Sequence, residues 1–100
     1  MKYILLVLTL FSPITFAAET VQDGNVTNIT SIKEGLLIIL DTGKPSGCKQ
    51  TSGWMLIPEE NKTMVSVALA MHLAGKKRAA IYVDIHAPGG YCKVIQYDPL

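Results

Sequence analysis

Apolar and polar residues are arranged along the chain in a pattern that predicts β-strands before a single helix. Residues 26–32 are rich in Thr, Val and Ile, and residues 36–40 form an unbroken apolar run, so both segments favour strands. The turn-forming residues 33–35 between them predict a hairpin. Residues 48–57 then predict a third strand, which ends at Pro58 because proline cannot continue a central strand.

A helix and two further strands follow. Residues 59–61 supply acidic and capping side chains ahead of the apolar segment 64–74, and Gly75 closes that segment, so both ends of a helix are indicated. Residues 78–86 alternate between apolar and polar side chains, which is typical of a half-buried strand. Residues 91–97 predict the last strand.

This order of elements predicts a mainly β domain with one helix. Three strands, a helix and two strands suit a five-stranded OB-fold-like small barrel, whose helix lies between the third and fourth strands. A split α+β sandwich would give the same order. Residues 18–24 are polar without a period and predict only a loose lead, and we expect a single domain over 18–100.

The first 17 residues have the pattern of a cleavable export signal. Lys2 precedes an apolar run at 3–11, and Thr15 and Ala17 are small residues at the positions that a signal peptidase reads. The run is shorter than the roughly 20 residues of a membrane helix. We therefore expect cleavage after Ala17, no membrane span in the mature chain, and a periplasmic or secreted location in a bacterium.

Charge and cysteine content restrict the function further. The chain has nine Lys and Arg and eight Asp and Glu, and removal of the signal takes away Lys2 and leaves a neutral domain without a basic stripe, so nucleic acid is not an expected partner. Cys48 and Cys92 are the only cysteines, and in an oxidising compartment they predict a disulfide between the third and fifth strands. Closing that loop would stabilise the domain by about 4 kcal/mol.

One motif suggests an enzyme. Asp41, Thr42 and Gly43 follow an apolar strand, as the catalytic aspartate does in aspartic proteases, and two copies of Asp41 in a homodimer could share a proton. Lys44 stands where a small residue is expected, and the later supporting segment is missing. Asp, Thr and Gly are also preferred turn residues, so we interpret the motif as a turn and expect no enzymatic activity.

Polar and aromatic side chains offer candidates for ligand binding. Tyr82, Asp84 and His86 share one face of a strand, but no serine lies in a nucleophile elbow, and two histidines are too few for a usual zinc enzyme. We therefore expect no metal and no cofactor. Trp54 is expected mainly in the barrel core, although its ring could also stack on a sugar. The candidate ligand-binding residues are Lys49, Trp54, Tyr82, His86 and Tyr91.

The predicted helix has almost no polar face. Nine of the eleven residues at 64–74 are apolar, and a small barrel can cover only one side of a helix. An exposed apolar patch of this kind marks an interface, so we expect self-association; the alternative is a helix sunk more deeply between the sheet and its loops. The candidate interface residues are Met64, Val67, Ala68, Met71 and Ala74.

The residues also carry a family resemblance. Residues 48–58, the helix end at 73–76, the strand at 81–83 and the returning Cys92 resemble the B subunits of subtilase-cytotoxin and pertussis-like toxins. The resemblance implies an OB-fold, a five-membered ring around the helices and binding of cell-surface glycans, with no glycan-contacting residue carried over. We expect an exported, non-enzymatic protein that binds a glycan or a partner protein. The alternatives are a monomeric periplasmic accessory or inhibitor protein and the homodimeric protease built on Asp41.

Overall fold

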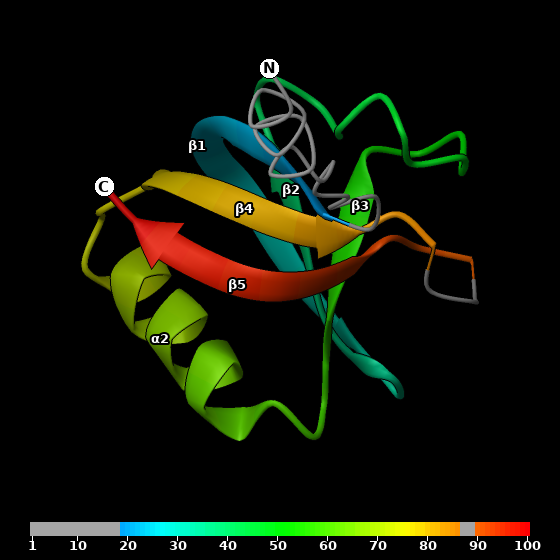
Figure 1. The fold of residues 1–100 in the computed structure, drawn as a ribbon. Helices are drawn as coiled ribbons and strands as arrows, with labels where there is room; N and C mark the ends of the chain where they lie inside the picture. The colour runs from blue at the N-terminus through cyan, green and yellow to red at the C-terminus, as the bar shows by residue number, and fades with distance from the viewer. Residues whose placement is uncertain (1–18, 87–89) are drawn as a thin grey trace, which may run out of the picture.

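The computed structural model describes residues 19–86 and 90–100 of the 100-residue chain (Figure 1). The expected signal at 1–17 and the cleavage site before Ala18 lie outside the described residues. The elements in chain order are β1 (Glu19–Ile32), β2 (Gly35–Leu40), β3 (Trp54–Pro58), α2 (Lys62–Leu73), β4 (Arg78–Asp84) and β5 (Lys93–Pro99).

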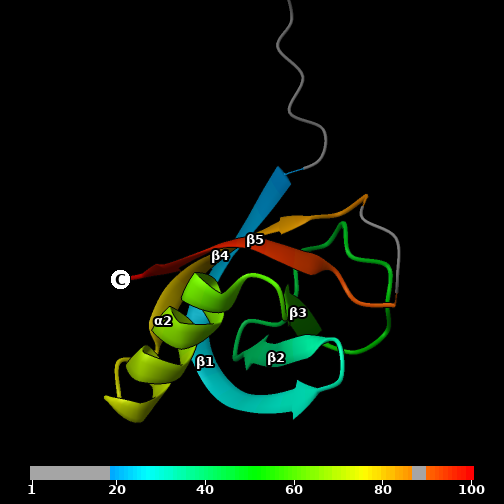
Figure 2. The same cartoon turned by 90° about the horizontal axis from the view of Figure 1, so that it is seen from below.

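The five strands form one sheet that closes into a barrel in the order β1-β2-β3-β5-β4, with β4 returning to β1. All neighbouring strands are antiparallel except β3 and β5, which run parallel and share the single register pair Leu56 and Lys93. Figure 2 shows the helix lying across one side of this sheet. The expected mainly β architecture with five strands and one helix is confirmed.

The longest strand, β1, is longer than the sequence predicts. Residues 19–25 pair with β4 from Asp84 back to Arg78, although residues 18–24 were expected to form only a loose lead. The second half of β1 pairs with β2, and the register shifts between Val26 and Asn28. The sequence hides the first half because its strand character comes from the backbone ladder with β4, and not from an apolar alternation of its own.

Three of the other predicted strands have different bounds in the structure. β3 starts only at Trp54, so the segment from Cys48 to Gly53 is a loop, and β4 ends at Asp84, two residues early. β5 runs from Lys93 to Pro99, so Cys92 precedes it. The reason lies in the backbone pairing. β3 pairs with β2 only from Trp54 onward, β5 pairs with β4 only from Lys93 onward, and Asp84 is the last residue of β4 that has a strand partner.

The barrel core consists of inward side chains from all five strands. Met55, Ile57, Ile38, Ile81 and Val83 are fully buried at its centre. Ala68 of α2 is 2% exposed and joins the same core, and four further helix residues pack against it, namely Met64, Val65, Val67 and Met71. The helix therefore closes one end of the barrel beside β3 and β5.

The two ends of α2 are formed differently. Gly75 adopts a left-handed φ of 79°, and the backbone N–H of Lys76 donates to the Met71 carbonyl at 2.9 Å, so the predicted glycine stop is present. Asn61 occupies the N-cap position, but its side chain makes no capping hydrogen bond. Residues 59–61 therefore precede the helix as expected, but the Asn61 side chain does not cap it with a hydrogen bond.

Candidate functional site

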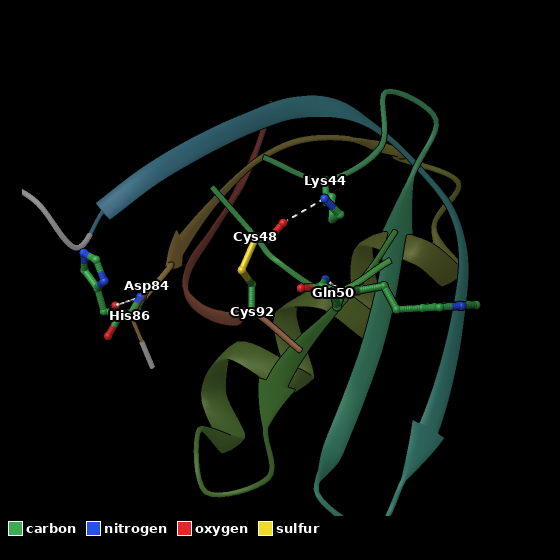
Figure 3. The surroundings of a disulfide bond; sticks show 7 residues. Lys44, Cys48, Gln50, Asp84, His86 and Cys92 are labelled. Carbon is green, nitrogen blue, oxygen red and sulfur yellow. Dashed lines mark hydrogen bonds between the residues drawn. A yellow bond between two sulfur atoms is a disulfide. The ribbon is translucent and has the colours of Figure 1, made fainter. Parts of the chain in front are cut away.

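The predicted disulfide is present and joins two loops at the edge of the barrel (Figure 3). Cys48 and Cys92 have Cα atoms 5.7 Å apart, and both residues are buried. The Leu56 N–H donates to the Cys92 carbonyl at 2.9 Å, and the Lys44 ammonium donates to the Cys48 carbonyl at 2.8 Å. The bond therefore fixes the start of β5 beside the middle of β3.

Trp54 lies outside the core, contrary to expectation. Met55 and Ile57 point into the barrel, so the period of two along β3 turns Trp54 outward. It is half-buried and pairs in register with Ile39, and its carbonyl accepts a hydrogen bond from the Gln50 amide at 2.8 Å. The sequence indicates that Trp54 belongs to a strand, but its face depends on the register in which that strand pairs with β2.

The carboxylate of Asp41 fastens a turn to β1. One oxygen accepts from the Asn25 backbone N–H at 2.9 Å and the other from the Asn25 side-chain amide at 3.0 Å. These hydrogen bonds, the backbone one first, lower the pKa of Asp41 below its ordinary value. Thr42 donates its hydroxyl to the Asp23 carbonyl at 2.8 Å. The geometry favours the turn interpretation of this motif, because both carboxylate oxygens are engaged within the fold.

The candidates on and after β4 are not gathered into a site. The Asp84 carboxylate accepts from the backbone N–H of His86 at 2.9 Å, and no hydrogen bond to the His86 ring is found among the described residues (Figure 3). Tyr82 lies on the outer face, where it pairs in register with Val21 of β1 and Gln96 of β5. None of these three side chains lines the cleft described next.

A cleft opens instead where β3 and β5 meet. It has a volume of about 500 Å³ and takes residues from the β1–β2 turn, the end of β3 and the start of β5. We call it the seam cleft, and its main lining residues are Lys33, Glu34, Leu56, Pro58, Glu59, Tyr91 and Lys93. Of the five candidate ligand-binding residues, only Tyr91 lines it.

Tight backbone packing holds the seam cleft in shape. The Glu59 N–H donates to the Glu34 carbonyl at 2.9 Å, which ties the hairpin turn to the end of β3. Gly35 has a φ of 150°, and a Cβ there would meet the Ile57 carbonyl oxygen. The sequence predicts a plain turn at Lys33 and Glu34, because nothing local in it shows that this turn lies beside Tyr91.

The exposed face of α2 is apolar, whereas the lining of the seam cleft mixes apolar and charged side chains. Leu73 is 86% exposed, Leu69 is 36% exposed, and Ala70 and Ala74 are exposed beside them. Of the proposed interface residues, Ala68 faces the barrel and only Ala74 is exposed. The other three, Met64, Val67 and Met71, are half-buried and pack against the barrel core. The alternative of a deeply sunk helix does not hold, because Ala68 is the only buried residue of α2.

The comparisons add no relative. No family model, curated protein or solved structure matches the chain. In the described part of the chain, no helix is long and apolar enough to cross a membrane. Within residues 19–86 and 90–100, no group of three or more His, Cys, Asp or Glu side chains is placed to hold a metal ion.

Proposed function

We propose that this protein is an exported, non-enzymatic binding protein that takes a glycan or a segment of a partner protein in the seam cleft. The observation that carries the proposal is the cleft itself. Leu56 and Pro58 give it apolar walls, Tyr91 gives it an aromatic ring, and Lys33 and Glu34 bring opposite charges to its rim. A few polar groups around an apolar recess are typical of sites for small ligands.

The chemistry of the lining favours a neutral, polyhydroxylated ligand. A tyrosine ring packs well against the apolar face of a sugar. Charged groups of both signs can donate to and accept from hydroxyl groups, since lysines are donors and carboxylates are acceptors. A polyanion would be repelled by Glu34, Glu59 and Glu60, which all lie at the cleft.

The position of the cleft agrees with the proposed fold family. In OB-folds, the face of the second and third strands and the loops between strands one and two and between strands four and five bind oligosaccharides. Here Lys33 and Glu34 come from the first of those loops, and Tyr91 comes from the second. The strand order supports assignment to an OB-fold, and with it the resemblance to toxin B subunits.

The disulfide and the sequence support the proposed compartment. A structural disulfide is compatible with the periplasm or the extracellular medium, because thiols stay reduced in most cytosols. Together with the signal pattern at 1–17, it supports export through a cleaved signal peptide. We also propose that the mature chain self-associates through the exposed apolar side of α2.

A glycan array tests the proposed function. The mature protein, detected through a C-terminal affinity tag so that the cleft lysines stay unmodified, should bind a defined set of glycans, and Tyr91→Ala should weaken the best of them about tenfold in calorimetry. Tyr82→Ala is the matched control, because it removes the same ring from the outer face of β4 and should bind as the native protein does.

Three outcomes would count against this function. Absence of any glycan binding, with a monomeric chain that binds a single periplasmic protein outside the seam cleft, would favour the monomeric accessory or inhibitor protein. Equal weakening by Tyr91→Ala and Tyr82→Ala would remove the seam cleft from the proposal. Acid proteolysis that Asp41→Asn abolishes would favour the homodimeric protease.

A further inference from the structure

The helix α2 separates two groups of opposite charge. Glu59 and Glu60 precede it and are exposed, and Lys76 and Lys77 follow it and are exposed. Between them, Lys62 is the only Lys, Arg, Asp or Glu in the helix, and it lies in the first turn. The helix surface thus runs from a net acidic end, across an uncharged middle, to a basic end.

The uncharged middle carries a ridge and a groove. Leu73 projects with 86% of its surface exposed, and Leu69 lies one turn before it on the same side. Beside Leu69, a groove of about 500 Å³ runs between the helix and the β1–β2 hairpin, with Leu36, Val65 and Ser66 in its walls. The ridge and the groove therefore lie on one continuous face of the helix.

Opposite charges at the two ends decide how a second copy fits on this face. Glu60 lies nine residues before Leu69, and Lys77 lies eight residues after it. If two copies pair antiparallel with Leu69 at the centre, the acidic end of each meets the basic end of the other. Parallel pairing would place like charges together, and antiparallel pairing also opposes the two helix dipoles.

The same arrangement fits the ridge to the groove. Leu73 is four residues after the centre and Val65 is four residues before it, so an antiparallel partner places Leu73 of one copy over Val65 of the other. Val65 lines the groove beside Leu69, which gives the protruding side chain an apolar seat. Ala70 and Ser66 are small, which allows the two helices to approach closely.

We infer that the exposed face of α2 docks a second copy of this chain as a two-fold symmetric, antiparallel helix pair centred on Leu69. The inference rests on the proposed self-association and specifies its geometry. A two-fold contact uses the same patch on both copies, whereas a five-membered ring joins two different patches. One helix face is smaller than a standard interface, so the dimer forms at about 10 to 500 µM.

Sedimentation equilibrium of the mature protein tests the geometry. The native chain should approach twice the monomer mass as its concentration rises, and Leu73→Asp should stay monomeric. Val21→Asp is the matched control, because Val21 is 49% exposed on β1, outside this face, and should dimerise as the native protein does. Far-ultraviolet circular dichroism of both variants verifies that they remain folded.

Charge reversal and cross-linking separate this dimer from other assemblies. Glu60→Lys should weaken the dimer, and adding Lys77→Glu in the same chain should restore it, because each end again faces an opposite charge. Leu69→Cys should form a disulfide-linked dimer, since this residue faces its own copy at the centre, and Val21→Cys should not.

A monomer at 500 µM would overturn the proposed self-association. A five-fold mass, or association that Leu73→Asp leaves unchanged, would overturn the antiparallel geometry alone.

Discussion

Two strand pairs that close the barrel are held together in different ways. β1 and β4 are joined by seven consecutive residue pairs, from Glu19 with Asp84 to Asn25 with Arg78. β3 and β5 share only Leu56 with Lys93, and their contact is completed by the disulfide on one side and by α2 on the other. The covalent bond is thus found where the backbone ladder is shortest.

The same contrast explains where a cleft can form. Along β1 and β4 the continuous ladder places Tyr82 on an outer face that takes no part in the seam cleft. At the seam of β3 and β5 the strands diverge, and the seam cleft opens with Leu56 and Lys93 in its lining. A barrel that is weakly paired at one seam therefore gains a recess there, and it needs another source of stability to keep the recess in shape.

Removing the disulfide should have the largest effect on this contrast. The double change Cys48→Ser with Cys92→Ser should lower the free energy of unfolding by about 2 to 5 kcal/mol, as measured by urea denaturation. Hydrogen exchange should quicken first at the Leu56 amide, which donates to the Cys92 carbonyl, while the β1–β4 ladder keeps its relative protection. Equal loss of protection at both seams would contradict a local role for the bond.

Overpacking the helix contact should have an intermediate effect. Ala68 is buried against the barrel, so Ala68→Leu should lower the free energy of unfolding by about 1 to 3 kcal/mol. Ala70→Leu makes the same change on the exposed side and should stay within about 0.5 kcal/mol of the native protein at concentrations where it is monomeric. Thermal denaturation of both variants measures the difference, and equal effects would show that α2 does not brace the seam through Ala68.

The smallest effect concerns the turn after β2, which the Asp41 carboxylate fastens to β1. Hydrogen bonds from Asn25 lower the pKa of Asp41 below 3.8, so the ionised carboxylate stabilises the fold above that pH and loses its contribution as the pH falls through the lowered value. The stability gap between the native protein and Asp41→Asn should therefore narrow in acid. Urea denaturation between pH 2 and 6 measures this difference in the free energy of unfolding. A difference that does not change with pH would exclude a stabilising role for the ionised Asp41 carboxylate.

Much of the fold could be predicted because its signals are local or unique. The glycine stop at Gly75, the apolar run of β2 and the single available pairing of two cysteines each leave little choice. The outward face of Trp54 could not be predicted, because Met55, Leu56 and Ile57 show no apolar–polar alternation and a one-residue slip in pairing register reverses every side chain. The first half of β1 was missed since only its pairing with β4 identifies it as a strand.

The candidate site was harder to predict than the fold. Tyr91 was among the candidates by its residue type alone. Lys33 and Lys93 are 60 residues apart in the chain and meet only because the hairpin turn, the end of β3 and the start of β5 converge. Such a cleft is a property of strand order and register, and neither can be obtained from a single short motif.

The most direct test of the account is to map where a bound ligand lies. Mature, isotope-labelled protein titrated with the strongest ligand from the glycan array should show amide shift changes concentrated at Lys33, Glu34, Tyr91 and Lys93, with the β4 outer face at Tyr82 unaffected. Changes concentrated around Tyr82, with the seam cleft silent, would contradict the claim that this protein binds its ligand where β3 and β5 meet.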